Sequence, residues 1–241
     1  MYKEGVYFSD ITRHQEDSDY KVRAISRLLF PILSSQKIPV GSYADVGCGS
    51  GGVTKAMKAQ LDGLGFQTKK IEGFDISPHV DRLEQEGIVF RMADFATEGE
   101  VMDLVTLTDV FEHVTDPVSF ISNVSKKARI IAFHIPLDDC LSVNFRNLQR
   151  AKIKNPGHLI FLNTNSALNM ITQSGLKILD YDYSLETLSA PSNNETLLQK
   201  IAAPFKLLIC KISPWMLAKI FGFSLVVIAE NENFSVSEKA G

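Results

Sequence analysis

The segment YADVGCGSGG, residues 43–52, decides the fold of this chain. A short apolar run ends at Val46, and four glycines then fall within six residues. Glycines between a strand and a helix let backbone N–H groups approach a ligand at the helix N-terminus. The segment therefore predicts a strand at residues 43–46, a ligand-binding turn, and a helix whose inward-facing residues recur at helical spacing: Val53, Ala56, Met57, Gln60, Leu61 and Leu64.

Short apolar runs and helical patterns alternate along the rest of the chain, which is typical of a mainly parallel sheet covered on both faces. A helix is expected at 77–87, with Ser77 as its cap, Pro78 in its first turn and Gly87 as its stop. The remaining helices are predicted at 20–33, from Asp116-Pro117 onward and at 163–175. Besides the first strand at 43–46, strands are predicted at 70–75, 88–95, 101–110, 128–137, 176–186 and 223–232. Irregular or helical insertions are predicted at 138–156 and 189–222.

Length and composition indicate one α/β domain. The chain has 241 residues, of which 45% are hydrophobic and 22% charged, and its net charge is −3. This acidic balance argues against a nucleic-acid partner. Three distant cysteines and a first segment without an apolar core favour a cytoplasmic protein. Lysines and prolines interrupt the apolar region 201–229, so it is not expected to span a membrane.

Asp45 distinguishes two interpretations of the glycine turn. Gly47, Gly49 and Gly52 satisfy the G-x-G-x-x-G pattern of dinucleotide-binding proteins, which is weak evidence when it stands alone. A carboxylate two residues before the first glycine would repel a pyrophosphate. It suits S-adenosylmethionine, whose ammonium and sulfonium groups are cationic. We therefore expect S-adenosylmethionine as cofactor, with S-adenosylhomocysteine as its product.

Further acidic and polar residues follow the next strands. Asp75 ends the second strand, where a carboxylate can accept hydrogen bonds from both ribose hydroxyls. Asp94 and Phe95 follow the third strand and suit the adenine amino group and ring. TDVFEHV, residues 108–114, follows the fourth strand. All these segments are expected at the carboxyl edge of the sheet, where open α/β sheets bind their ligands.

Together these segments resemble the class I S-adenosylmethionine-dependent methyltransferases. YADVGCGSGG is similar to the family's first motif, GFDIS to its second-strand acid, MADF to its adenine-side acid and LTDVFEHV to its motif after the fourth strand. The later segment PGHLIFLNTNSALNMITQSGLKI is similar to the ending of the ubiquinone-biosynthesis-type small-molecule O-methyltransferases. The resemblance covers roughly residues 40–185. It implies a Rossmann-like seven-stranded sheet of order 3-2-1-4-5-7-6, with the seventh strand antiparallel, helices on both faces and helical lid insertions.

The resemblance implies one methyltransferase domain over residues 1–241. Residues 1–40 form an N-terminal lid or helix, 41–135 the donor-binding core, and 136–157 and 189–222 acceptor-side insertions. A cationic lid that grips the donor's carboxylate is one reading of the basic N-terminal run, and a solvated amphipathic segment is the other. The expected donor-binding residues are Arg13, Asp45, Gly47, Cys48, Gly49, Gly51, Asp75, Ile76, Asp94, Phe95, Thr108, Asp109, Val110 and His113.

His113 and His158 are the candidate catalytic residues, because histidine is the usual general base for a hydroxyl group. A role in orienting loop backbone is the alternative for His113. His134 lies in an apolar strand and is expected to be a hydrogen-bonded core residue. The pair Asp138-Asp139 is expected to be solvated, and no third ligand at suitable spacing accompanies it, so no metal is expected.

The predicted function is methyl transfer to a small-molecule or lipid-like acceptor, on oxygen in preference to nitrogen or carbon. The segment after the fourth strand is not the Asn/Asp-Pro-Pro-Tyr type of nucleobase and glutamine methylators. A non-catalytic donor-binding or partner subunit and, with less support, a nicotinamide-dependent oxidoreductase are the alternatives. An apolar stripe within 201–220 is expected to pack over the acceptor pocket or against a second subunit, as in a homodimer; peripheral membrane contact is the alternative.

Overall fold

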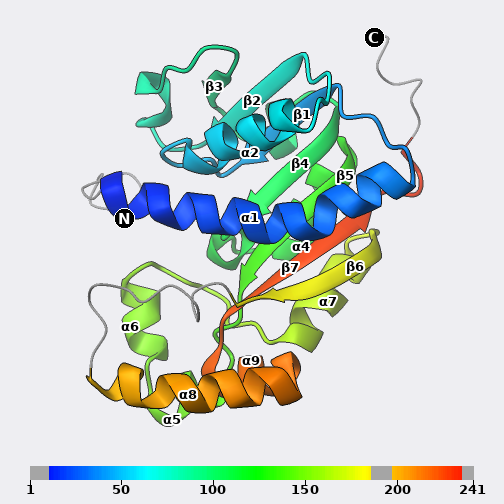
Figure 1. Cartoon of the computed structure of the whole chain (residues 1–241). Helices are drawn as coiled ribbons and strands as arrows, with labels where there is room; N and C mark the ends of the chain where they lie inside the picture. The colour runs from blue at the N-terminus through cyan, green and yellow to red at the C-terminus, as the bar shows by residue number, and fades with distance from the viewer. Residues whose placement is uncertain (1–10, 186–196, 235–241) are drawn as a thin grey trace.

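The computed structural model describes residues 11–185 and 197–234, with the side chains of 11–16, 81 and 197–204 left undescribed. Its centre is a seven-stranded sheet of order β3-β2-β1-β4-β5-β7-β6 (Figure 1). Strand β7 is antiparallel to both β5 and β6, and the other pairings are parallel. The expected strand order and the antiparallel seventh strand are therefore confirmed. The strands are β1 (Ser42–Val46), β2 (Lys70–Asp75), β3 (Val89–Met92), β4 (Met102–Thr108), β5 (Ala128–Pro136), β6 (Lys177–Ser184) and β7 (Ser224–Glu230).

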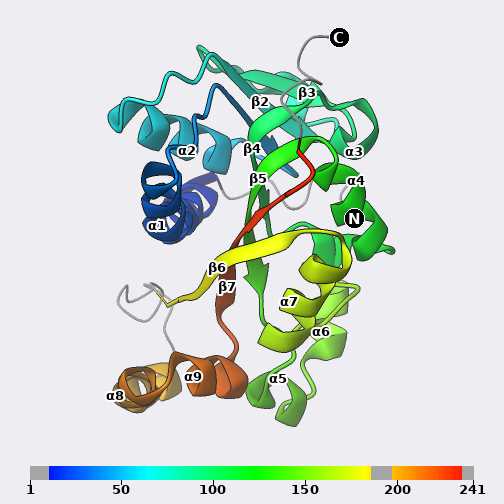
Figure 2. The same ribbon diagram turned by 90° about the vertical axis from the view of Figure 1, so that its right-hand side faces the viewer.

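Helices cover both faces of the sheet, as Figure 2 shows. On one face, α1 (Ile11–Ser35) and α2 (Gly52–Gly63) bury Leu29, Met57 and Leu61 against the strands. On the other face lie α3 (Phe95–Glu98), α4 (Pro117–Ser125) and α7 (Thr164–Gln173). The central strands β1 and β4 are buried along nearly their whole length because both faces are covered.

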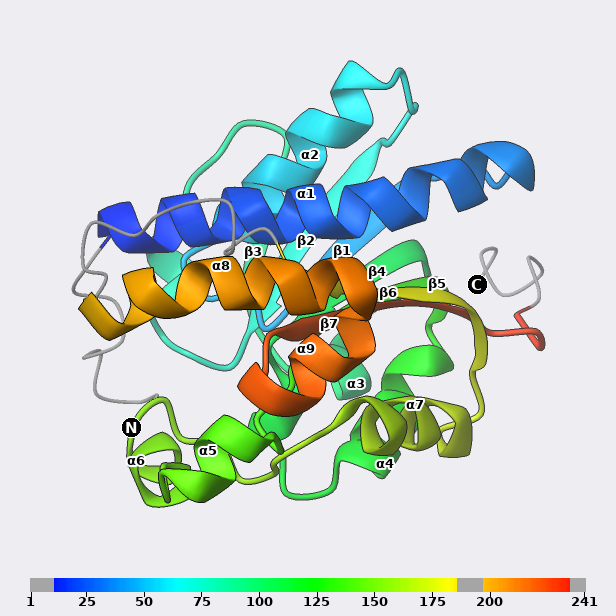
Figure 3. The same cartoon turned by 60° about the horizontal axis from the view of Figure 1, so that its bottom comes forward.

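The two insertions are helical and lie together at one end of the molecule (Figures 1 and 3). The first contains α5 (Leu141–Phe145) and α6 (Gln149–Lys154), and the second contains α8 (Leu197–Ile212) and α9 (Pro214–Phe221). Helix α9 packs on α5 and α8. Residues 189–196 of the predicted second insertion lie outside the described part of the chain. Among the helices of the described residues, none is long and apolar enough to cross a bilayer.

The helix expected at 77–87 is wrong. This segment holds only a single 3-10 turn, η3 (Val80–Arg82), and then a bridge between Gln85 and Ile88. It offers few apolar residues to a helix face, so burial cannot offset the cost of starting a helix here. The capped helices at 117 and 164 are confirmed: the side chains of Asp116 and Asn163 accept hydrogen bonds from the first turns of α4 and α7.

Candidate active site at the carboxyl edge of the sheet

A cavity of about 100 Å³ lies where β1, β2 and β4 end. Four of the segments that line it come from distant parts of the sequence: helix α1, the glycine turn, the end of β2 and the end of β4. The lining residues are Asp17, Ser18, Lys21, Asp45, Gly47, Cys48, Gly49, Ser50, Gly52, Val53, Asp75, Thr108 and Asp109. Three of the four predicted segments, the glycine turn and the ends of β2 and β4, thus meet at this edge, whereas Asp94 and Phe95 do not line the cavity.

Gly47 has to be a glycine for two reasons. Its φ is +76°, and a Cβ atom built there would lie 2.5 Å from Cγ2 of Val110. Gly51 also has a φ of +76°, and a Cβ atom built there would lie 2.8 Å from the ring of Phe90. The backbone N–H groups of Gly47 and Cys48 donate to the carbonyl of Phe74, so the turn is tied to β2. The Cys48 side chain is buried, although the residue lines the cavity.

Asp45 forms the floor of the cavity and is only 1% exposed. Its two carboxylate oxygens accept hydrogen bonds from the hydroxyls of Thr54, at 2.7 Å, and Thr106, at 2.8 Å. Burial raises the pKa of Asp45 to about 6, and the two threonine hydrogen bonds oppose that shift. The carboxylate is therefore held beneath the glycine turn, in contact with the protein interior.

Asp75 holds the glycine turn from the β2 side. One carboxylate oxygen accepts from the N–H of Gly49 at 2.8 Å, and the other accepts from the N–H of Ser77 at 2.8 Å. Because a carboxylate oxygen has two lone pairs, both oxygens can still accept from a ligand. The neighbouring Ile76 exposes 74% of its surface, which is unusual for so apolar a side chain.

Asp94 and Phe95 are placed differently from expectation. Asp94 is the N-cap of α3, and its Oδ1 accepts from the N–H of Ala96 at 2.9 Å. The ring of Phe95 is 1% exposed and packs edge-on against Phe74, with 5.1 Å between centroids. The ring therefore belongs to the core between β2 and α3, and its contact with adenine stays a prediction.

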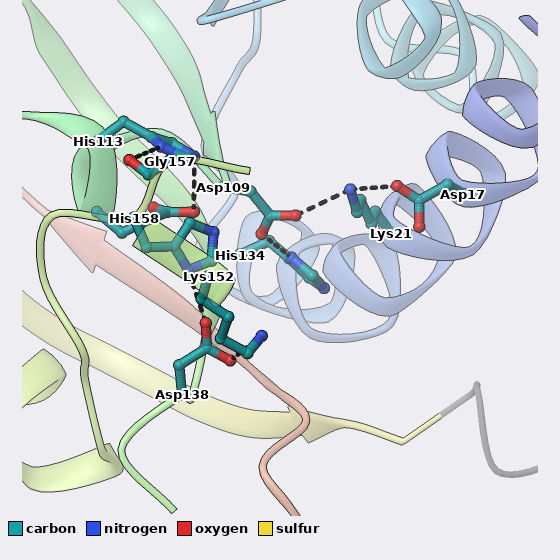
Figure 4. Close-up of polar contacts among 10 residues, drawn as sticks. Asp17, Lys21, Asp109, His113, His134, Asp138, Lys152, Gly157 and His158 are labelled. Atoms are coloured by element: carbon teal, nitrogen blue, oxygen red, sulfur yellow. Dashed lines mark hydrogen bonds and ion pairs between the residues drawn. The ribbon is translucent and has the colours of Figure 1, made fainter. Parts of the chain in front are cut away.

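Asp109 joins three elements at the end of β4. Its φ is +53°, and its carboxylate accepts from Nζ of Lys21 on α1, at 2.9 Å, and from Nδ1 of His134 on β5, at 2.7 Å (Figure 4). Burial opposes ionisation, but the neighbouring Lys21 and His134 hold the pKa of Asp109 well below its usual range. His134 is 1% exposed, so its prediction as a hydrogen-bonded core residue is confirmed. The hydroxyl of Thr108 is buried with no hydrogen-bond partner among the described residues.

His113 and His158 lie together, with their ring centroids 4.8 Å apart. Nδ1 of His113 lies 3.0 Å from the carbonyl oxygen of Gly157, and Nδ1 of His158 lies 2.6 Å from Oδ2 of Asp138 (Figure 4). Both partners are acceptors, so Nδ1 donates in each ring, and Nε2 carries the lone pair in the neutral form of the ring. Burial lowers the pKa of His113, which favours this neutral form.

Glu112 is not among the site residues predicted from the sequence, although it directly precedes His113 in the EH pair. Its side chain is 1% exposed, and one ligand atom from each of Glu112, His113 and His158 lies within 4.8 Å of the other two. A carboxylate and two imidazoles in this arrangement are able to hold a metal ion. The EH pair after a strand was visible in the sequence, but the sequence spacing does not predict that His158 lies beside it.

Asp138 is not solvated as expected. It is 8% exposed and accepts from Nδ1 of His158 and, at 2.8 Å, from Nζ of Lys152. Its neighbour Asp139 points to the amides of Asn144 and Asn163. Lys21 and Arg13 both belong to the basic N-terminal run that was expected to form a lid. Lys21 lines the cavity, and the side chain of Arg13 lies outside the described residues.

A second, larger cavity of about 460 Å³ lies between the insertions and α7. Apolar residues of α5 and α9 form much of its wall, and the ammonium of Lys219 lies over the ring of Trp215 at 4.7 Å. Its lining residues are Leu137, Asp139, Cys140, Leu141, Asn144, Asn163, Thr164, Asn165, Trp215, Ala218, Lys219 and Ile220. Asp139 lines this cavity, while the preceding residue, Asp138, accepts from His158.

Comparison with protein families gives a match over most of the chain. A family model described as a methyltransferase domain matches residues 13–181. A comparison with curated proteins found no match.

Solved structures of low sequence identity share the fold. The putative methyltransferase bound to the Trm112 activator of Haloferax volcanii is 14% identical, with TM-score 0.60 over 91% of this chain and 92% of that one. Magnesium protoporphyrin IX methyltransferase of Synechocystis PCC 6803, with bound SAH, is 14% identical, with TM-score 0.55 over 92% and 87%. The plantazolicin methyltransferase BpumL, with SAH, is 14% identical, with TM-score 0.54 over 94% and 93%.

Proposed function

This chain belongs to the methyltransferase-domain family, and on that premise we propose that it transfers a methyl group from S-adenosylmethionine to an oxygen of a small-molecule or lipid-like acceptor. The observation that carries the proposal is the contact between Asp75 and Gly49. The acid that ends β2 is bonded to the glycine turn at the edge of the same cavity, with oxygen lone pairs left for a ribose.

The donor is proposed to lie across the carboxyl ends of β1, β2 and β4. Asp75 accepts from the ribose hydroxyls, and the exposed side chain of Ile76 covers one face of the adenine. The methionine part lies over Gly47 and Gly49, where Asp45 below the turn supplies negative charge for the ammonium and sulfonium. The unpartnered hydroxyl of Thr108 is available as a further hydrogen-bonding group.

Donor entry requires movement of helix α1 side chains. The cavity of about 100 Å³ is smaller than the roughly 300 Å³ of the smallest usual ligand sites. Asp17 and Lys21 of α1 line the cavity, and the ammonium of Lys21 forms ion pairs with both Asp17 and Asp109. We propose that these side chains act as the N-terminal lid, within a domain divided into lid (1–40), donor core (41–135) and acceptor-side insertions (136–157 and 189–222).

The acceptor is proposed to enter from the insertions. The larger cavity has an apolar wall from α5 and α9 and polar groups near Asp139, which suits an apolar molecule with a hydroxyl group. During transfer the acceptor oxygen forms a bond to the methyl carbon while the sulfur–methyl bond breaks. The electron pair of that bond stays on sulfur, which becomes the neutral thioether of S-adenosylhomocysteine. The hydroxyl proton goes to Nε2 of His113 or His158.

Most of the rate enhancement is expected to come from positioning the acceptor and the donor. The sulfonium already carries a good leaving group, so the protein needs to hold oxygen, methyl carbon and sulfur in line at near-contact distance, which supplies several kcal/mol. The buried walls of the cavities exclude water from that line.

Ligand binding distinguishes this proposal from its alternatives. Purified protein is incubated separately with labelled S-adenosylmethionine and labelled NAD, and retained label is counted after gel filtration. Retention of S-adenosylmethionine supports the proposal, and retention of NAD alone overturns it in favour of an oxidoreductase. Turnover to S-adenosylhomocysteine is then followed by mass spectrometry across an acceptor library. Donor retention without turnover on any hydroxylated acceptor would favour the non-catalytic subunit.

A further inference from the structure

Glu112 is a buried carboxylate that lacks a counter-charge within hydrogen-bonding distance. It is 1% exposed, and neither carboxylate oxygen has a hydrogen-bond partner among the described residues. Its closest ionic contact is Nε2 of His113, at 3.8 Å from Oε1. That distance exceeds a hydrogen bond, so a proton on Glu112 would have no acceptor there. An ionised carboxylate this deeply buried needs a cation, since desolvation without one costs several kcal/mol.

The two histidines beside Glu112 are oriented as metal ligands. His113 donates Nδ1–H to the carbonyl of Gly157, and His158 donates Nδ1–H to Asp138. Histidines that bind metals nearly always donate their second N–H to a carbonyl or a carboxylate, which fixes the ring and its tautomer. Here both rings are fixed in this way, and both leave Nε2 as the atom with a lone pair.

The backbone holds the two segments in register. The N–H of Leu159 donates to the backbone carbonyl of Glu112 at 2.8 Å. The segment that carries His158 is therefore hydrogen-bonded to the segment that carries Glu112 and His113. Lys152 adds a 2.8 Å ion pair to Asp138, which secures the carboxylate behind His158. The cluster is therefore built from two bonded segments with a supporting layer of its own, and not from a chance meeting of flexible side chains.

From this geometry we propose that Glu112, His113 and His158 bind one divalent transition-metal ion. Two imidazole nitrogens and one carboxylate oxygen are a donor set that suits Zn²⁺ and its first-row neighbours better than Ca²⁺ or Mg²⁺. One ligand atom from each residue lies within 4.8 Å of the others, whereas tetrahedral zinc with bonds of about 2.0–2.1 Å needs ligands about 3.3 Å apart. Side-chain closure of about 1.5 Å thus completes the site and leaves a coordination position for water or an oxygen of the acceptor.

The ion would also correct the local charge. The carboxylates of Asp109 and Asp138 both act electrostatically on the buried carboxyl group of Glu112. Lys21 and Lys152 form ion pairs with Asp109 and Asp138 and therefore do not neutralise Glu112. A divalent cation would supply the positive charge that Glu112 lacks. The test of this ion site needs neither donor nor acceptor, so its outcome is separate from that of methyl transfer. With the ion bound, Nε2 of His113 and His158 would be ligands and would not serve as bases, so ion binding and the proton transfer proposed above are alternative uses of the same atoms.

The test is metal binding to the purified chain after chelation, in a Cys210→Ser background so that the partly exposed thiol does not contribute. Zn²⁺ is titrated by calorimetry, and Co²⁺ is followed by its visible absorption. The wild-type ligand set is expected to bind one ion per chain. Glu112→Gln should weaken the affinity at least 100-fold, and Asp138→Asn, which acts through His158, should weaken it about 10- to 100-fold.

Two controls keep the outcome decisive. Glu86→Gln removes an exposed carboxylate away from the cluster and should leave Zn²⁺ affinity unchanged. Glu112→Gln keeps the shape of the buried side chain and cannot carry an unpaired charge, so in chelator its melting temperature should equal or exceed that of the parent, which rules out unfolding as the reason for lost binding. Substoichiometric binding by the parent, or equal affinity in the parent and Glu112→Gln, would overturn the proposal and leave Glu112 as a protonated acid.

Discussion

Nζ of Lys21 on helix α1 lies 2.9 Å from Oδ2 of Asp109 at the end of β4, and 12% of the lysine side chain is exposed. The pair connects residues 88 positions apart in sequence, and it closes one side of the donor cavity. It makes the N-terminal helix part of the site, although the sequence motifs that resemble the family begin only near residue 40, whereas the family model matches from residue 13.

Replacing Lys21 by methionine is expected to cost about 2 kcal/mol of unfolding free energy. The methionine retains most of the apolar stem, but Asp109 loses a largely buried ionic partner. Urea denaturation measures the change. Arg27→Met on the same helix is the control: its ion pair with Asp182 is about half exposed, so the loss should be between about 0 and 1 kcal/mol. Equal losses in the two variants would contradict the structural role of Lys21.

Gly47→Ala is expected to destabilise the protein by about 2–4 kcal/mol and to abolish donor binding. The new Cβ would lie 2.5 Å from Val110, at a φ of +76°. Gly63→Ala at the end of α2 is the matched control, because its Cβ would meet nothing within 4 Å and alanine favours helix. It should stabilise the protein by up to about 1 kcal/mol. Thermal melts with and without donor compare the two, and a harmless Gly47→Ala would disprove the packing argument.

Asp75→Asn is expected to weaken S-adenosylmethionine binding by roughly 1–3 kcal/mol, or about 5- to 150-fold, because an amide accepts ribose hydrogen bonds less strongly than a carboxylate. Calorimetry measures the donor affinity. Asp62→Asn removes an exposed acid on α2 and should have no effect on it. An unchanged affinity in Asp75→Asn would count against the proposed orientation of the donor.

Asp45 should make the ligand-free protein less stable as the pH rises. Its pKa is about 6 in the folded protein and near 3.8 in the unfolded chain, so the folded state binds the proton more tightly. Stability from this group is complete below pH 4 and is lost as the pH rises towards and past 6, by up to about 3 kcal/mol. Asn at position 45 does not titrate and can still exchange hydrogen bonds with both threonines.

The measurement is the difference in unfolding free energy between the wild type and Asp45→Asn at pH 4, 5, 6 and 7. Relative to wild type, the variant should become progressively more stable across this range. Asp62→Asn, whose carboxylate is half exposed, corrects for general effects of removing an acid. A difference that stays constant from pH 4 to pH 7 would mean that Asp45 is ionised throughout.

The sheet could be predicted because its central strands are buried and appear in the sequence as mainly apolar runs, with glycines or helix caps between them. The segment 77–87 misled for a physical reason: Ser77, Pro78 and Gly87 supply start and stop signals, but without an apolar face those signals do not make a helix. Phe95 is a second case in which local sequence did not determine the outcome. Its position after β3 was correct, yet the direction of its ring depends on contact with Phe74.

The site was predictable where one strand end supplies the residue, as for Asp75 and Asp109. The cluster of Glu112, His113 and His158 was not, because its third member comes from a segment 45 residues away whose path depends on the first insertion. Asp138 was expected in solvent for the same reason. Only the folded chain brings Lys152 and His158 to it.

Strand β7 lies between β5 and β6 and forms hydrogen bonds with both. During synthesis on the ribosome, β5 and β6 therefore emerge before the strand that joins them, and each presents an unpaired edge until residues 224–230 have left the exit tunnel. Exposed edges of apolar strands attract other strands. Nascent chains of this protein are thus expected to need chaperone protection late in translation, after the donor-binding half has already been made.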